Sequence, residues 1–233
     1  MRSLVQITPA LPDSRSHQKA RYANRTWLFD LDNTLHNASA HIFPHIGRSM
    51  RDYICRYLDL DENEATQLRQ QYWKRYGATL LGLIRHYDID PEHFLHHTHQ
   101  FHDLASMVVI ERGLKSMLKQ LPGRKIIFSN APLDYTQAIL AITGIRHCFD
   151  AVYSVERLRF NPKPQTKGFL HLLRTEGLDP RACVMIEDTL PNLKTAKRLG
   201  MKTVWVNPGL RKPPYADIRV RSVLDLPGRL GQL

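Results

Sequence analysis

The chain has 233 residues, 42% of them hydrophobic, which is enough apolar material for one large domain or a core with a smaller inserted domain. No apolar stretch approaches the roughly 20 residues needed to cross a bilayer, so we expect a soluble protein with no membrane partner. Lysine and arginine number 33 against 22 acidic residues, giving a formal charge of +11 that favours anionic ligands such as nucleotides, sugar phosphates or nucleic acid.

Cysteine use and the N-terminal segment indicate the compartment. The three cysteines lie far apart and form neither a disulfide framework nor a metal-ligand pattern, which favours a reducing cytoplasm. Residues 1–24 carry basic side chains without the hydrophobic region of a secretory signal, so we expect a loosely ordered basic tail. The basic residues of the chain are scattered and form no RNA-binding signature, which makes nucleic acid an unlikely partner.

The first predicted strand runs from Arg25 to Leu31, where a nearly continuous apolar run is typical of a strand covered on both faces. The next stretch, residues 38–106, is predicted to be entirely helical. Its first helix carries apolar residues at three- and four-residue steps, namely Ile42, Ile46, Met50, Tyr53, Ile54 and Tyr57.

Three more helices are predicted in the same stretch. Asp61 and Glu64 have the spacing of a capping box and would begin the second helix. The third is predicted at residues 79–86. Asp90 followed by Pro91 is typical of a helix start, and this fourth helix is predicted to continue to about His102.

After Gly113 the pattern alternates between helix and strand. Helices are predicted at 114–121, 132–143, 166–176 and 190–199, and strands at 126–128, 151–154, 182–186 and 203–206. We therefore predict an α/β fold with a doubly wound parallel sheet, formed by residues 25–37 and 107–233, and an inserted helical cap at 38–106. The turn-rich segment after Pro208 predicts no regular element.

Two carboxylates, Asp30 and Asp32, come just past the apolar run 27–29 and stand at the carboxyl end of the first predicted strand, where open α/β sheets place their ligands. One could attack a substrate while the other transfers protons. The alternative interpretation is an ordinary Asx turn formed by residues 32–34.

Polar groups also follow three of the later strands. Ser129 and Asn130 precede a predicted helix start and could hold phosphoryl oxygens, although this pair is also common in loops. Lys163 lies between two prolines that could present its charge to an anion, or it could simply face solvent. Glu187 and Asp188 suit a hard cation such as Mg²⁺, or they could only decorate a helix N-terminus.

The order of these four segments closely resembles the haloacid dehalogenase superfamily of phosphatases over about residues 26 to 206. The resemblance implies that Asp30 is a nucleophile that forms an aspartyl-phosphate. It implies that Asp32 is the general acid for the leaving alcohol and then the base for water. Thr34 would brace this loop. An acid at position 32 disfavours dehalogenation, because a dehalogenase has no alcohol to protonate.

The remaining roles that the resemblance implies concern the phosphate and the metal. Ser129 and Asn130 would bind the transferring phosphoryl group, and Lys163 would neutralise the charge of the nucleophile and the phosphate. Asp188 would bind Mg²⁺ together with Asp30 and the backbone carbonyl of Asp32, and Glu187 would be a direct or water-bridged ligand.

Within the superfamily the chain is most similar to the pyrimidine 5'-nucleotidase branch, in residues 29–35, 76–80 and 185–192. That likeness implies UMP or CMP as substrate, with Tyr76 and Thr79 as candidate base or sugar contacts or as helix packing and capping residues. His36 departs from the branch, in which tyrosine is expected.

The alternatives are a phosphoglycolate or sugar-phosphate phosphatase, and a non-enzymatic basic module that binds nucleic acid or protein. Six histidines of the cap invite a metal-site hypothesis, but a structural or surface role is favoured because no glutamate completes a zinc-protease pattern. They are His86, His93, His96, His97, His99 and His102.

Overall fold

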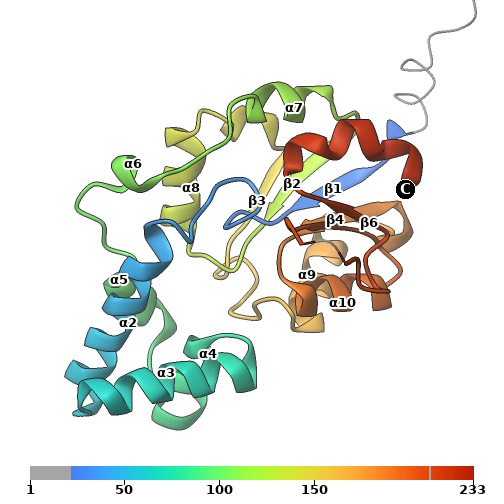
Figure 1. Cartoon of the computed structure of the whole chain (residues 1–233). Coiled ribbons are helices and arrows are strands. Elements are labelled where there is room, and N and C mark those ends of the chain that lie inside the picture. The colour runs from blue at the N-terminus through green and yellow to red at the C-terminus, as the bar shows by residue number, and fades with distance from the viewer. Residues whose placement is uncertain (1–21, 210) are drawn as a thin grey trace, which may run out of the picture.

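A computed structural model describes residues 22–209 and 211–233, so most of the predicted N-terminal tail lies outside the described residues. Six parallel strands form one sheet in the order β3-β2-β1-β4-β5-β6 (Figure 1). They are β1 (Thr26–Phe29), β2 (Arg124–Phe128), β3 (Ala151–Tyr153), β4 (Cys183–Glu187), β5 (Lys202–Val206) and β6 (Ile218–Val220). The predicted parallel sheet is confirmed.

Helices cover both faces of this sheet (Figure 1). On one face, α7, α8 and the 3₁₀-helix η3 pack on one buried cluster, and on the other face α9 and α10 pack on a second cluster. Their bounds are α7 (Leu114–Gln120), α8 (Leu133–Ile142), α9 (Thr166–Thr175), α10 (Leu190–Arg198) and η3 (Val223–Gln232). Two short 3₁₀-helices, η1 (Arg146–Cys148) and η2 (Pro180–Ala182), complete the connections. The sheet is therefore doubly wound.

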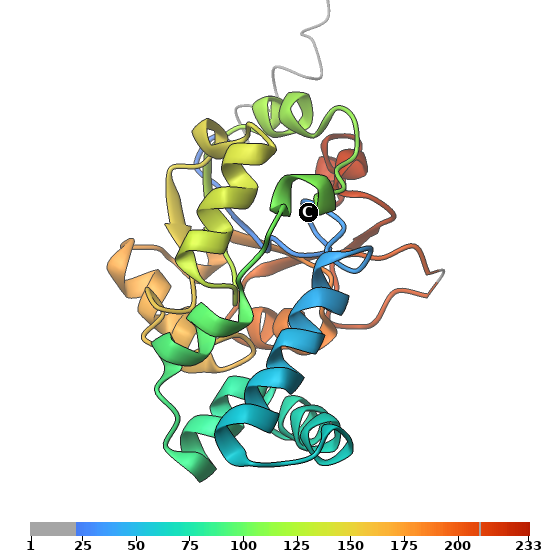
Figure 2. The same cartoon turned by 90° about the vertical axis from the view of Figure 1, so that its left-hand side faces the viewer.

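A separate helical unit lies between β1 and β2 in the chain (Figure 2). It consists of α2 (Ile42–Leu58), α3 (Glu62–Tyr76), α4 (Thr79–Tyr87) and α5 (Pro91–Thr98). These helices share a third buried cluster that includes Tyr53, Ile54 and Phe94. Helix α2 joins the two parts of the molecule, because Ile42 and Ile46 belong instead to a cluster of the sheet core.

Local chemistry explains where these helices begin. The side chain of Asp61 accepts hydrogen bonds from the backbone of α3, and Glu64 completes the predicted capping box. Asp90 caps α5, with Pro91 at its first turn, as predicted. The predicted end of this helix near His102 is wrong, because α5 ends at Thr98. The short helix α6 (Leu104–Met107) follows and packs against the sheet core.

The C-terminal segment holds two elements that the sequence did not predict, β6 and η3. Asp217 anchors β6 beside β5. Its carboxylate accepts a bond from Lys197 Nζ at 2.6 Å and from the Thr203 backbone nitrogen at 2.9 Å. Tyr22, within the predicted loose tail, is also buried, and its hydroxyl donates to the Leu230 carbonyl at 2.6 Å. The two ends of the described chain therefore pack against the same core.

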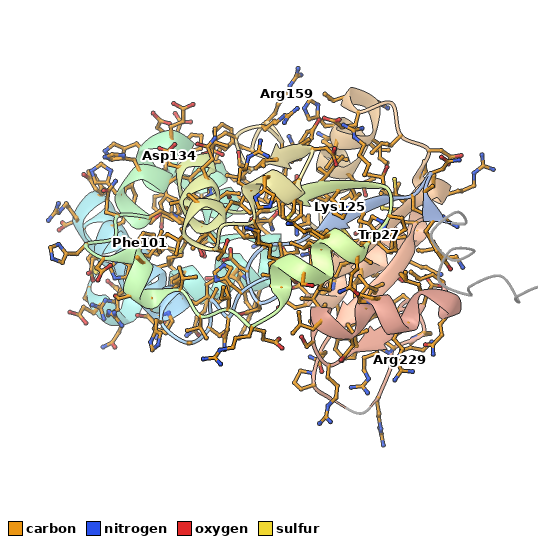
Figure 3. The ribbon with its side chains drawn as sticks, turned by 90° about the horizontal axis from the view of Figure 1, so that it is seen from above. Trp27, Phe101, Lys125, Asp134, Arg159 and Arg229 are labelled. Carbon is orange, nitrogen blue, oxygen red and sulfur yellow. The ribbon has the colours of Figure 1, made fainter. Side chains whose placement is uncertain are left out.

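The carboxyl ends of the strands face the helical unit. In Figure 3, Trp27 and Lys125, near the starts of β1 and β2, lie on the side of the molecule away from that unit, while Phe101 and Asp134 lie toward it. Side chains that follow the strands therefore meet between the sheet and the helical unit.

No helix of the described residues is long and apolar enough to cross a membrane.

Asp217→Asn tests the anchor of β6. Burial favours a higher pKa for Asp217, but bonds from Lys197 and Thr203 outweigh it and bring the pKa below 3.8. The stabilisation is therefore complete above the unfolded-state pKa and disappears as pH falls through the lower folded-state pKa. We expect the variant to lose about 1 kcal/mol of unfolding free energy at pH 7 in urea denaturation, and little at pH 2. Asp179→Asn is the matched control and should lose clearly less stability, because Asp179 pairs with Arg181 in solvent and asparagine can still accept the Arg181 backbone bond.

Candidate active site

Asp30 lies at the switch point of the sheet, where the strand order reverses between β1 and β4. Its backbone nitrogen donates to the Ile186 carbonyl at 3.0 Å, which continues the pairing of the two strands. Its carboxylate accepts a bond from Lys163 Nζ at 2.7 Å and from the Thr34 hydroxyl at 3.3 Å. Asp30 is buried, and the Thr34 bond ties its carboxylate to the loop that follows β1.

Lys163 is a buried cation shared by two acids. Its side chain is 1% exposed, and Nζ lies 2.7 Å from both Asp30 Oδ1 and Glu187 Oε2. Glu187 Oε2 also accepts from Asn192 Nδ2 at 3.0 Å, and its other oxygen accepts from the Thr189 backbone at 3.1 Å. Because donors occupy both oxygens, Glu187 is better placed to hold Lys163 than to bind a cation directly.

The electrostatics of the site show a shortage of positive charge. Burial raises the pKa of Asp30 to about 7, and the nearby charge of Glu187 adds to the effect while Lys163 opposes it. Burial likewise raises the pKa of Glu187 to about 7 against the opposing charge of Lys163. Burial alone would lower the pKa of Lys163, but the two carboxylates raise it above its usual value. Lys163 is therefore charged, and one cation serves several carboxylates.

A divalent ion would supply the missing charge. Among the described residues, the one group of three potential ligands is Asp30, Glu187 and Asp188, whose nearest donor atoms lie within 4.8 Å of one another. Asp188 accepts a bond from the Thr189 hydroxyl at 3.1 Å, and its carbonyl accepts from the Trp205 indole at 2.8 Å. An all-oxygen, anionic donor set suits Mg²⁺. Asp30 and Asp188 therefore fit this metal as ligands, while Glu187 keeps its bonds to Lys163 and Asn192.

Asn130 binds the backbone of the segment that carries the lysine. Its Nδ2 donates to the Lys163 carbonyl at 2.8 Å, and its Oδ1 accepts from the Lys163 backbone nitrogen at 2.7 Å. Ser129 is buried beside it, and its hydroxyl oxygen accepts from the Ala131 backbone at 3.0 Å. Asn130 thus positions Lys163, while the phosphate-binding role of Ser129 and Asn130 stays a prediction.

Asp32 has a different set of partners from Asp30. Its Oδ1 accepts a bond from the Tyr135 hydroxyl at 2.6 Å and lies 2.9 Å from His36 Nε2. Burial, followed by the charge of Asp32, raises the pKa of Tyr135 well above its usual value, so the hydroxyl is the donor. Sequence reasoning did not single out Tyr135. The available signal was its place in the first turn of α8, the helix that follows the Ser129–Asn130 loop.

One loop of the helical unit approaches this site. Gly77 has a φ of +82°, and a Cβ built there would lie 2.9 Å from Pro164 Cδ, next to Lys163. Tyr76 and Thr79 flank it. The Tyr76 hydroxyl lies 2.6 Å from His86 Nε2, and the buried Thr79 hydroxyl donates to the Arg69 carbonyl at 3.1 Å. The Thr79 bond joins α4 to α3, and substrate contact by either residue stays a prediction.

The histidines of the helical unit make contacts within it and with the sheet core. His93 Nδ1 lies 2.8 Å from the Tyr53 hydroxyl, and His97 Nδ1 lies 2.8 Å from the His93 carbonyl. The ring of His99 packs against Tyr135, with 5.9 Å between centroids, and burial lowers the pKa of His99 to about 4. None of these histidines belongs to a group of three potential metal ligands in the described part of the chain. These contacts agree with the structural role.

The family model for haloacid dehalogenase-like hydrolases matches residues 27–206, well over half of the chain. The chain belongs to this family. Phosphate metabolism protein 8 of Saccharomyces cerevisiae is 26% identical over 209 residues, covering 83% of this chain and 63% of that protein. Hexitol phosphatase B of Escherichia coli K12 is 29% identical over 102 residues, covering 42% of this chain and 46% of that protein. The matches thus span 63% and 46% of the lengths of these relatives.

A solved structure supports the same architecture. The crystal structure of a HAD phosphatase from Thermococcus onnurineus superposes with a TM-score of 0.63 and 23% sequence identity. The match covers 89% of this chain and 98% of that chain. At 23% identity this likeness shows the fold of the chain and nothing further.

Lys163→Met tests the shared cation. The variant leaves the buried carboxylates of Asp30 and Glu187 without their common partner, which typically costs 3–5 kcal/mol. We expect a loss of about 3 kcal/mol of unfolding free energy, at the lower end because a carboxyl group can take up a proton. The unfolding free energies of the variant and the wild type are measured by urea denaturation at pH 7 with a chelator present.

Two further variants make this result specific. Lys167→Met, an exposed lysine on α9, is the matched control and should unfold like the wild type. Adding Glu187→Gln to Lys163→Met should recover part of the stability, because one unpaired charge is removed. A Lys163→Met variant as stable as the wild type would contradict the shared-cation interpretation.

Proposed function

We propose that this family member is a magnesium-dependent phosphomonoester hydrolase that acts through an aspartyl-phosphate on Asp30. The observation that carries the proposal is the buried Asp30 carboxylate, held 2.7 Å from Lys163 and within metal-ligand reach of Asp188. A second acid, Asp32, follows two residues later with separate partners. Lys163 together with a bound Mg²⁺ would keep Asp30 ionised to attack, and Asp32 is available for proton transfer.

The proposed reaction has two displacements. In the first, an oxygen of Asp30 attacks phosphorus, the bond to the leaving oxygen breaks, and Asp32 gives its proton to that oxygen. In the second, Asp32 takes a proton from water, whose oxygen attacks phosphorus, so that the bond between phosphorus and the Asp30 oxygen breaks, inorganic phosphate leaves and the Asp30 carboxylate is regenerated. Asp30, Asp188 and the Asp32 carbonyl would hold Mg²⁺, which when bound would neutralise charge on the phosphoryl group.

The helical unit α2–α5 would act as a cap that contacts the leaving group. Its loop at Gly77 already approaches the lysine segment, so Tyr76 and Thr79 are the candidate contacts. We propose a pyrimidine nucleoside 5'-monophosphate, UMP or CMP, as the substrate. A sugar phosphate is the second candidate, favoured by the similarity to hexitol phosphatase B.

Asp30→Asn tests the nucleophile. We expect phosphate release to require Mg²⁺, to stop with a chelator, and to fall by more than about 10³-fold in the variant, because the covalent route is lost. A malachite-green assay over nucleotides and sugar phosphates measures it. Asp134→Asn, an exposed aspartate on α8, is the matched control and should keep wild-type activity.

Two outcomes would contradict this proposal. Undiminished turnover by Asp30→Asn would remove the nucleophile assignment. A flat screen together with salt-sensitive nucleic-acid binding would instead support a basic binding module, since such binding weakens as salt rises.

The substrate proposal is tested by comparing two nucleotides with ribose 5-phosphate, which has a hydroxyl group in place of the base. CMP and UMP contain a ribose 5-phosphate group with a pyrimidine base attached, whereas ribose 5-phosphate itself has no base. We expect kcat/KM at least about tenfold higher for the nucleotides, equal to about 1.4 kcal/mol of base recognition in the transition state. Equal or better turnover of ribose 5-phosphate, or of fructose 1-phosphate, would favour the sugar-phosphate candidate.

A further inference from the structure

Two donors converge on one oxygen of Asp32. The Tyr135 hydroxyl donates to Oδ1 at 2.6 Å, and His36 Nε2 lies 2.9 Å from the same atom. Both side chains are buried, and they come from different elements: His36 from the loop after β1 and Tyr135 from α8. Neither donor engages the second oxygen, Oδ2, of the carboxyl group.

The ring of His36 is placed to donate through Nε2. Its Nδ1 is buried and has no hydrogen-bond partner among the described residues, so a proton on that atom would be left unpaired. The hydrogen-bond pattern therefore assigns the ring proton to Nε2, where Asp32 Oδ1 accepts it.

The chain that returns from α5 to the core fixes the ring of Tyr135. Phe101 and His99 both pack against it, with ring centroids 5.6 Å and 5.9 Å away. Tyr135 itself is 3% exposed. The hydroxyl is thus held in place by contacts that do not involve Asp32.

We propose that Tyr135 and His36 are positioning residues that bind Oδ1 of Asp32 and thereby direct Oδ2 toward the leaving oxygen of the substrate. The inference rests on the proposed function, in which Asp32 is the general acid. An acid whose Oδ1 accepts two bonds carries its proton on Oδ2. As the phosphorus–oxygen bond breaks, its electron pair stays on the leaving oxygen, that oxygen takes the proton from Oδ2, and the two donors stabilise the resulting carboxylate.

The test is the dependence of kcat/KM on the basicity of the leaving group. Tyr135→Phe removes the hydroxyl and keeps the ring. We expect kcat/KM for phenyl phosphate and alkyl phosphates to fall about 10- to 100-fold, part of the roughly 10²–10⁴ that general acid–base catalysis contributes. For 4-nitrophenyl phosphate, whose leaving group needs little protonation, we expect less than about a threefold change. A series of substituted phenyl phosphates should therefore give a steeper slope in the variant.

His36 provides a second, independent pair of variants. Gln presents an amide N–H near the place of Nε2, whereas Leu presents none. We expect His36→Leu to steepen the same slope and His36→Gln to restore it partly. This pair keeps the inference testable if Tyr135→Phe proves unstable by circular dichroism.

Tyr153→Phe is the matched control. It removes a tyrosine hydroxyl that donates to Glu176 at the same 2.6 Å distance, and it should leave the slope unchanged. An equal loss of kcat/KM on every aryl phosphate, or no loss on any, would overturn the positioning role. If the wild type hydrolyses these substrates and Asp30→Asn does not, such a result would contradict this inference and leave the proposed function standing. A wild type that hydrolyses no substrate would instead remove the proposed function, and the inference with it.

Discussion

The site depends on one buried lysine that is shared between two carboxylates. Lys163 Nζ lies 2.7 Å from Asp30 and from Glu187, and 5.1 Å from the centre of the Phe128 ring. Removing three charged groups from water is costly, and only close contact among them offsets that cost. The arrangement therefore requires a backbone that holds both carboxylates within hydrogen-bond distance of Lys163 Nζ. Asn130 contributes to it by binding both backbone polar atoms of Lys163.

Much of the fold could be predicted because the strands of a doubly wound sheet are buried on both faces. The apolar runs at β1 and β4 are fully buried, and their polar ends meet at the switch point. The signal failed where apolar periodicity is weak. Strand β6 has three residues and follows a proline-rich segment, and its place depends on bonds that Asp217, directly before it, accepts from Thr203 and Lys197, which lie far back in the sequence. The end of α5 was misjudged because the histidines after Thr98 carry no apolar pattern.

The predicted site residues come together for a general reason, since parallel strands end at the same edge of the sheet. Asp30, Lys163, Glu187 and Asp188 therefore form one cluster. The division of labour within it could not be predicted, because it depends on which oxygen meets which donor. The sequence does not reveal that Glu187 is surrounded by donors, or that Asp32 bonds with Tyr135 instead of with the partners of Asp30.

The glycine at the contact between the helical unit and the lysine segment has a consequence for protein engineering. At Gly77 any side chain would meet the rigid ring of Pro164 and would also require a backbone conformation that L residues rarely adopt. Libraries that vary this contact should therefore leave the position unchanged. Diversity is better introduced at its neighbours, where new side chains can be sampled without pushing the helical unit away from the lysine segment.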